Sequence, residues 1–168
     1  MSNIRIEIAD IETMDTDCVV NAANEGLWEG SGVCGAIFRA AGAGQLKKAC
    51  DAIGGCPTGH AVITPGFDLK AKYIVHAVGP RWSGTEKDKV LLAECYKDAL
   101  ERAKENDCHS IAFPLISSGV FGCPVEVAWE QAIKGCTEWT AENPDYDVDI
   151  VFAVRKESVK EKGENMLD

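Results

Sequence analysis

Two glycine-rich segments of the chain have the residue types and the spacing that bind phosphate. The first follows the apolar pair Val19 and Val20, and it places Gly30, Gly32 and Gly35 at the start of a predicted helix. Glycines let backbone N–H groups approach an anion closely, and a helix N-terminus carries partial positive charge. The first segment is therefore predicted to cradle a phosphate.

The second segment repeats this design later in the chain. An apolar strand is predicted over Ile111–Ile116, the turn Ser117–Gly122 follows it, and Pro124 stands where a helix can begin. Neither segment is a G-x-G-x-x-G dinucleotide fingerprint, and neither ends in the Gly-Lys-Ser/Thr of a nucleoside-triphosphatase loop. One such turn alone would more often be a plain connector, but two of them suit a pyrophosphate.

Polar residues at the ends of predicted strands are candidates for binding the rest of a nucleotide. In an open α/β sheet, ligands bind beyond the carboxyl ends of the strands, where we expect Asp10, Asn21, Asn24, Ser117 and Ser118. The Asp10 carboxylate can accept a hydrogen bond from an exocyclic amine such as that of adenine, and the two asparagines suit ribose hydroxyls. The alternative is purely local, because Asp caps helices and Asn favours turns. With the two loops, these residues predict a nucleoside diphosphate-sugar as ligand.

Composition bounds the class of protein. The 168 residues are 46% hydrophobic and 26% charged, which predicts one domain with a core over residues 1–168. A net charge of −10 without a basic stripe disfavours general nucleic-acid binding and anionic membranes. Eight cysteines with no C-x-x-C pair and no signal peptide predict reduced thiols and a cytoplasmic location, and nothing requires a metal or a cofactor.

Helices and strands alternate along the chain, which predicts an α/β protein built as a helix-sheet-helix sandwich. Apolar runs predict strands over Ile4–Ala9, Cys18–Ala22, Ala61–Thr64, Tyr73–Val78, Ile111–Ile116 and Val148–Val154. Apolar residues at helical spacing predict helices over residues 34–53, Val90–Lys104 and Val125–Glu142. The charge-rich tail, residues 155–168, is predicted to form a short exposed helix that frays.

The tryptophans divide into two groups. Trp28 and Trp82 lie in polar, glycine-containing segments and are predicted to rim a cleft, whereas Trp129 and Trp139 belong to a helical pattern and are predicted to pack in the core. His76 lies on a predicted strand and is expected to be a structural residue rather than a catalytic one.

The chain resembles macrodomains, the ADP-ribose-binding modules, along nearly its whole length. The resemblance rests on segments that occur in the family's order and spacing: VVNAAN (19–24), GSGVCGAIFRAAG (30–42), CPTGHAVIT (56–64), YIVHAVGP (73–80) and AFPLISSGVFGCP (112–124). The chain is most similar to the MacroD-type branch, which contains bacterial O-acetyl-ADP-ribose deacetylases. The resemblance implies a three-layer α/β/α sandwich with a central mixed sheet. It also implies ADP-ribose, O-acetyl-ADP-ribose or mono-ADP-ribosylated proteins as partners.

The resemblance further implies a set of ligand-binding residues. Asp10 and Ile11 would contact the adenine, the two loops would hold the pyrophosphate, and Asn24 would hold the distal ribose. The implied set is Asp10, Ile11, Asn21, Asn24, Ser31, Gly32, Val33, Cys34, Ser117, Ser118, Gly119, Val120, Phe121 and Gly122. Within it, Asn24 and Cys34 are the candidates for a catalytic role.

Four positions depart from the hydrolytic branch that the chain resembles. Cys34 stands where that branch has its catalytic aspartate, Phe38 where it has histidine, and Phe121 where many members have tyrosine. Val154 stands where many relatives place an aromatic ring over the adenine. A thiol with a pKa of about 8.5 cannot replace a carboxylate base at pH 7. Turnover would then rely on Asn24 and the ligand's own pyrophosphate to position a water molecule.

Two classes of function therefore stay open at this point. One is a hydrolase of ADP-ribose esters that works by positioned water, and the other is a non-catalytic reader of free or protein-linked ADP-ribose. A nucleophilic Cys34 is disfavoured, because no histidine is near it in sequence and a bound pyrophosphate would oppose a thiolate. A third class, a regulator that binds a ribonuclease, is suggested only by resemblance to one bacterial relative.

Overall fold

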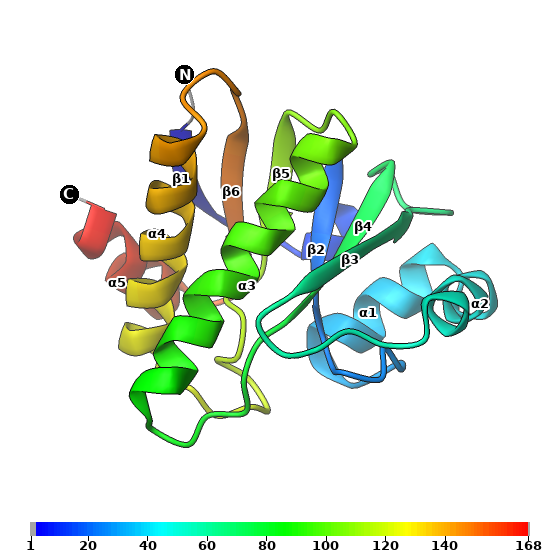
Figure 1. Cartoon of the computed structure of the whole chain (residues 1–168), viewed down its shortest axis with the longest axis horizontal. Helices are drawn as coiled ribbons and strands as arrows, with labels where there is room; N and C mark the ends of the chain where they lie inside the picture. The colour runs from blue at the N-terminus through cyan, green and yellow to red at the C-terminus, as the bar shows by residue number, and fades with distance from the viewer. Residues whose placement is uncertain (1–2, 168) are drawn as a thin grey trace.

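The computed structural model describes residues 3–167, which form a three-layer α/β/α sandwich around one mixed sheet (Figure 1). The six strands lie in the order β1-β6-β5-β2-β4-β3, and β3 alone runs antiparallel to its neighbour β4. The strands are β1 (Asn3–Ile8), β2 (Cys18–Ala23), β3 (Ala61–Pro65), β4 (Tyr73–Val78), β5 (Ser110–Phe113) and β6 (Asp149–Val154). This arrangement confirms the predicted fold class.

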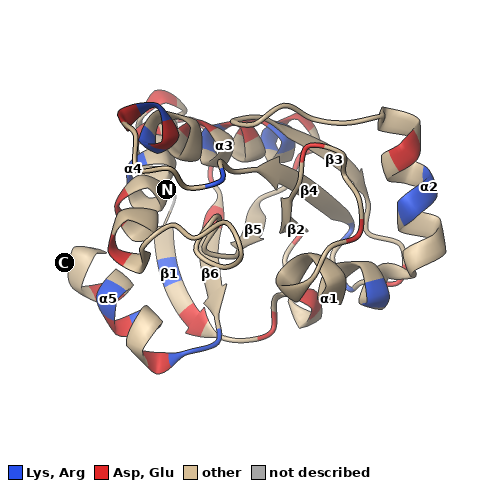
Figure 2. Cartoon of the chain, turned by 90° about the horizontal axis from the view of Figure 1, so that it is seen from below, with Lys and Arg blue, Asp and Glu red and all other residues tan. Residues whose placement is uncertain are grey.

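Helices cover both faces of the sheet, as Figures 1 and 2 show from two sides. They are α1 (Gly32–Ala41), α2 (Ala43–Ile53), α3 (Glu86–Glu105), α4 (Val125–Glu142) and α5 (Glu157–Leu167), and a single 3-10 turn, η1 (Ile11–Thr13), follows β1. Helices α3 and α4 pack together on one face, whereas α1 and α2 lie on the other.

The two faces have separate hydrophobic cores because side chains alternate along each strand. Along β2, Val20 packs into the core under α3 and α4, and Val19 packs into the core under α1 and α2. Trp129 and Trp139 are buried in the first core, which confirms their predicted packing role. All eight cysteines are free and buried, as expected for thiols that pack as small hydrophobic groups.

Two predicted boundaries differ from the structure by three residues or more. Strand β5 ends at Phe113 rather than at Ile116, because Pro114 has no N–H to donate to a neighbouring strand. Helix α3 begins at Glu86 rather than at Val90, because the Thr85 hydroxyl caps it by accepting a hydrogen bond from the Asp88 N–H at 3.2 Å. The residues freed from β5 join the loop before α4.

The C-terminal tail is helical over α5, which contacts α4 and β1. The Trp129 indole donates a hydrogen bond to the Val159 carbonyl at 2.9 Å. Gly163 is buried against the same indole, so closely that a Cβ there would lie 2.6 Å from a Trp129 ring carbon. The tail is thus docked on the core along one side, and its fraying in solution stays a prediction. Across residues 3–167, every helix is too short or too polar to span a lipid bilayer.

Candidate functional site

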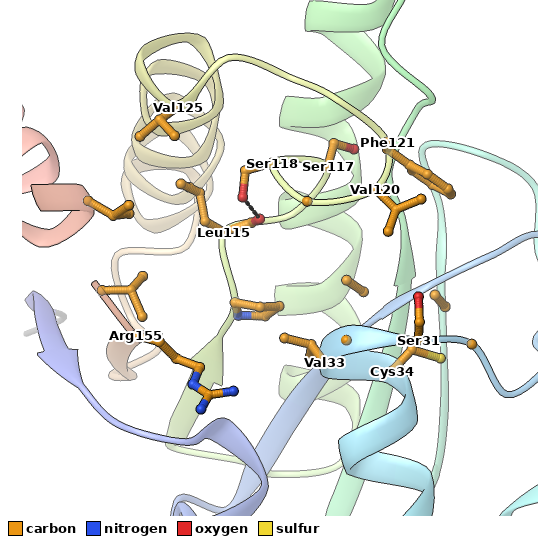
Figure 3. A pocket seen from close by; sticks show the side chains of 18 of the residues that line it. Ser31, Val33, Cys34, Leu115, Ser117, Ser118, Val120, Phe121, Val125 and Arg155 are labelled. Carbon is orange, nitrogen blue, oxygen red and sulfur yellow. Dashed lines mark hydrogen bonds between the residues drawn. The ribbon is translucent and has the colours of Figure 1, made fainter. Parts of the chain in front are cut away.

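A cavity of about 560 Å³ opens at the carboxyl ends of the central parallel strands. Its walls come from the loop between β2 and α1, the loop between β5 and α4, and the segment that joins β6 to α5 (Figure 3). A volume of this size is typical of a small-molecule site. Ten of the predicted ligand residues line it: Asn24, Ser31, Gly32, Val33, Cys34, Ser117, Ser118, Gly119, Val120 and Phe121.

The N-terminus of α1 presents free backbone donors to this cavity. Ser31 caps the helix without a side-chain hydrogen bond, and among the described residues the N–H groups of Gly32, Val33 and Cys34 have no protein partner. Such first-turn N–H groups attract anions. Gly32 has a φ of 58°, a backbone conformation that glycine adopts without strain. The glycine turn and the helix N-terminus predicted for the first loop are therefore present, and phosphate binding by them stays a prediction.

The second loop faces the first across the cavity (Figure 3). Within residues 3–167, the N–H groups of Gly119, Val120 and Phe121 also lack a protein partner. Val120 is 88% exposed, so this rim is open to solvent. Gly122 does not line the cavity, and its N–H closes the turn by donating to the Gly119 carbonyl at 3.0 Å.

The serine hydroxyls shape the second loop. The Ser117 hydroxyl donates to the Pro80 carbonyl at 2.8 Å, and the Ser118 hydroxyl donates to the Leu115 carbonyl at 2.7 Å. The Trp82 N–H donates to the Phe121 carbonyl at 2.8 Å, which ties the loop to the segment after β4. These hydroxyls are already engaged with the main chain, so the loop reaches a ligand chiefly through its backbone.

All charged side chains that line the cavity are basic, although the protein carries a net charge of −10. They are Arg81, Arg155 and Lys156, and Figure 2 shows the basic stretch between β6 and α5. The Arg81 guanidinium carbon lies 5.4 Å from the centre of the Phe121 ring, within cation–π distance. These three residues were not predicted from the sequence. They follow strand ends as the predicted polar residues do, and that position was the available signal.

Asp10 lies beside the Arg155 end of the cavity and does not itself line it. The Nε atom of Arg155 is 3.2 Å from Oδ1 of Asp10, an exposed ion pair of the kind that adds little stability. Asp10 makes no capping bond to η1, so its second oxygen stays available as an acceptor. Ile11 is buried in the core under α1. The structure thus places Asp10 next to the lining residue Arg155, and it buries Ile11 in the core, outside the cavity lining.

The Asn24 side chain also makes two hydrogen bonds within its own loop, which the sequence did not predict. Its Oδ1 accepts a hydrogen bond from the Trp28 N–H at 2.9 Å, and its Nδ2 donates to the Trp28 carbonyl at 3.0 Å. The side chain therefore fixes the loop before α1 as well as facing the cavity.

Replacing Asn24 should consequently destabilise the fold. We expect Asn24→Ala to lower the free energy of unfolding by about 1 to 2 kcal/mol, because it removes both bonds to Trp28. Urea unfolding followed by circular dichroism measures this change. Asn24→Asp is the matched control, since it keeps the acceptor and loses the donor, and its loss should be smaller. A wild-type midpoint for Asn24→Ala would mean that the two bonds do not hold the loop.

Cys34 lies at the opposite end of the cavity from Arg155 (Figure 3). The side chain is 6% exposed, and its Sγ donates to the Trp28 carbonyl at 3.6 Å. Burial raises the pKa of this thiol above its ordinary value, so it is protonated at neutral pH. No Asp, Glu, His or Tyr lines the cavity among the described residues. The site is equipped to bind an anion and lacks an ordinary general base.

Asn21 lies beneath the cavity rather than in its lining. It is 1% exposed, and its Nδ2 donates to Nδ1 of His76 at 3.0 Å. The opposite nitrogen of His76, Nε2, lies 3.0 Å from the Thr64 hydroxyl. Contact between Asn21 and a ribose hydroxyl stays a prediction that this burial disfavours. His76 is a buried structural residue, as predicted.

The burial of His76 makes stability depend on pH. Burial lowers the pKa of His76 to about 4, whereas an unfolded histidine titrates near 6.5. The unfolded chain takes up this proton first as the pH falls, so the free energy of unfolding should drop between about pH 6.5 and pH 4, by on the order of 3 kcal/mol. Urea midpoints measured across this range test the effect. His76→Gln serves as the control, and the drop must be smaller in that variant if His76 causes it.

Fold and cavity together define a three-layer α/β/α domain with an anion-accepting cavity at the carboxyl ends of its strands. The chain belongs to the Macro domain family, whose model matches residues 20–132. The predicted resemblance to macrodomains is thereby confirmed.

Individual relatives agree with this assignment. A macro domain-containing protein of Ralstonia nicotianae is 52% identical over 145 residues, which cover 86% of this chain and 82% of that protein. The human ADP-ribose glycohydrolase MACROD2 is 47% identical over 150 residues, which cover 86% of this chain but only 34% of that longer protein. A structure of the Oceanobacillus iheyensis macrodomain with ADP is similar with a TM-score of 0.90 at 37% identity, covering 96% of this chain and 88% of that one.

Proposed function

We propose that this chain binds ADP-ribose in the cavity between its two glycine-rich loops. The adenine would lie at the end near Asp10 and Arg155, and the pyrophosphate would lie between the loops. The distal ribose would then lie at the end formed by Asn24 and Cys34. Free ADP-ribose, O-acetyl-ADP-ribose and mono-ADP-ribosylated proteins share this recognised part.

The observation that carries the proposal is the pair of opposed backbone donor sets. Three unpartnered N–H groups at the start of α1 face three more on residues 119–121, across a cavity whose charged lining residues are all basic. A pyrophosphate has oxygens on two adjacent phosphates, so it can accept from both sets at once. Oriented amides bind phosphate without a lysine because the dipoles are fixed in place. Two relatives, a macrodomain solved with ADP and an ADP-ribose glycohydrolase, support the same ligand class.

Within this function, the geometry favours binding over turnover. Within residues 3–167, the only titratable side chains in the lining are Cys34, two arginines and a lysine, and the buried Cys34 thiol is neutral. None of them can act as a carboxylate base at pH 7. Hydrolysis of an ADP-ribose ester is the second candidate, favoured by the identity to MACROD2 and by the Asn24 carboxamide in the lining. It would proceed through a water molecule positioned by Asn24 and the pyrophosphate.

A titration followed by a turnover assay separates these functions. Calorimetry with ADP-ribose should show one binding site per chain. The proposed function would be contradicted if the titration gave no binding heat and ADP did not compete with ADP-ribose. The same protein is then incubated with O-acetyl-ADP-ribose, and acetate release is followed by NMR. Binding without release would establish a reader, and release that survives gel filtration and scales with protein concentration would establish the esterase.

A further inference from the structure

Trp28 is the most exposed aromatic ring that the structure describes. It is 69% exposed, whereas Trp129 and Trp139 are almost fully buried. An exposed indole keeps a large apolar surface in water, and such rings are enriched where proteins contact partners. The position of Trp28 therefore needs an explanation beyond packing.

The backbone of Trp28 is fixed at three points. Its N–H and carbonyl are both bound by the Asn24 carboxamide, and the carbonyl also accepts from the Cys34 thiol. The ring rests on Gly26, where a Cβ would lie 2.5 Å from the ring carbon Cε2. The indole is thus held on one side by the loop and offered to solvent on the other. A pre-organised surface of this kind loses little conformational entropy when a partner binds.

Trp28 lies immediately outside one particular end of the cavity. Its carbonyl is bonded to Asn24 and Cys34, which both line the cavity at the end where the distal ribose is placed. A group attached to that ribose would leave the cavity at this end. The indole is therefore close to whatever molecule carries the ADP-ribose.

The negative charge of the loop around Trp28 favours a partner with basic side chains. The loop from residue 24 to residue 31 contains Glu25 and Glu29 and no lysine or arginine. The Glu25 carboxylate is already bonded within the protein, because its Oε2 accepts hydrogen bonds from the N–H and the hydroxyl of Thr58. Among the described residues Glu29 has no ion pair, and its charge contributes to the raised pKa of the neighbouring Cys34 thiol. An indole beside an unpaired carboxylate favours a cationic side chain.

We propose that Trp28 and Glu29 form a docking surface for the polypeptide that carries the ADP-ribose, with a lysine or arginine of that polypeptide over the indole ring. This surface rests on the proposed function, since it places the modified residue at the Asn24 end of the cavity. It adds a preference that the cavity cannot supply, because the cavity contacts only the nucleotide part. ADP-ribose linked to a basic segment binds more tightly than ADP-ribose linked to a neutral one.

The test uses two peptides that carry ADP-ribose through the same hydrolysis-resistant linkage. Lysines flank the modified residue in one peptide, and serines flank it in the other. By calorimetry, the protein should bind the lysine peptide about three- to tenfold more tightly than the serine peptide, the range expected for a cation–π contact beside a carboxylate. Trp28→Ala and Glu29→Gln should each reduce this preference, whereas affinity for free ADP-ribose should change by less than about twofold.

Two further variants keep the test decisive. Trp28→Phe retains an aromatic ring and should retain part of the preference, even if the alanine variant is poorly folded. Val90→Ala removes another exposed apolar side chain, which is 58% exposed on α3 away from the cavity lining, and should leave both peptides unaffected.

Each contrary outcome has one meaning. Equal affinity of the wild-type protein for the two peptides, with free ADP-ribose bound normally, overturns the docking surface and leaves the proposed function intact. Loss of free ADP-ribose in a folded Trp28→Ala variant would make Trp28 a support for the cavity instead. A dimer in sedimentation that Trp28→Ala dissolves would assign the ring to a second copy of the chain. Failure of the wild-type protein to bind ADP-ribose would remove both proposals together.

Discussion

Gly119→Val is expected to lower the affinity for ADP-ribose by at least about 100-fold, which corresponds to about 2.7 kcal/mol. Gly119 lines the cavity, and a Cβ built there meets nothing within 4 Å. Its φ is not among the positive values, so a valine adds no backbone strain. The new side chain would instead fill the space between the two loops and keep the pyrophosphate from the backbone donors. Calorimetric titration of ADP-ribose measures the loss.

A second glycine supplies the matched control for this experiment. Gly44 lies in α2, outside the cavity lining, and a Cβ there also meets nothing within 4 Å. Gly44→Val should therefore bind ADP-ribose as the wild-type protein does. Thermal unfolding establishes that both variants are folded. Wild-type affinity in a folded Gly119→Val variant would refute the assignment of the second loop to the pyrophosphate.

The fold was predictable from the sequence because its strands are short apolar runs and its helices have a clear period. The uncertain boundaries were those set by single residues, such as Thr85, whose hydroxyl starts α3 four residues before the first apolar position. Pro114 likewise ended β5 early, although its missing donor could have been read from the sequence.

The two loops of the site were also predictable, since their chemistry belongs to contiguous glycine-rich segments. The basic residues were not predicted, because Arg81 follows β4 whereas the adjacent Arg155 and Lys156 follow β6, so the two groups are far apart in the sequence. Only the order of strands in the sheet brings the ends of β4, β5 and β6 to the same cavity. A local pattern contains no information on that order.

For Asn21, the sequence pattern predicted a contact with the ligand that its burial in the structure disfavours. Asn21 and Asn24 are three residues apart, and from sequence both suit a ribose. Asn21 belongs to β2, where it faces His76 on the adjacent strand, whereas Asn24 follows the end of that strand and reaches the cavity. The difference arises from one strand boundary. It separates a buried structural amide from a candidate ligand.

Cys34→Asp is expected to raise the hydrolysis of O-acetyl-ADP-ribose by about 100-fold or more over the wild-type rate, the scale of a positioned general base. Cys34 lies at the Asn24 end of the cavity, and its neutral thiol occupies the position where a carboxylate could take a proton from an attacking water. The gain should increase as the pH rises through the pKa of the new carboxylate, because only the ionised form accepts the proton. Acetate release measured between pH 5 and pH 8 tests both the size and the sign.

Cys34→Asn separates charge from shape in this experiment. The amide has nearly the same size as the carboxylate and cannot act as a base, so Cys34→Asn should bind ADP-ribose and show no gain in hydrolysis. If Cys34→Asp binds ADP-ribose normally and is also no faster, the missing carboxylate does not limit turnover. The limiting feature would then be the Asn24 side chain, whose amide is already bonded to Trp28 and is less free to orient a water molecule. A gain in Cys34→Asp alone would show that one substitution separates a reader of this fold from a hydrolase.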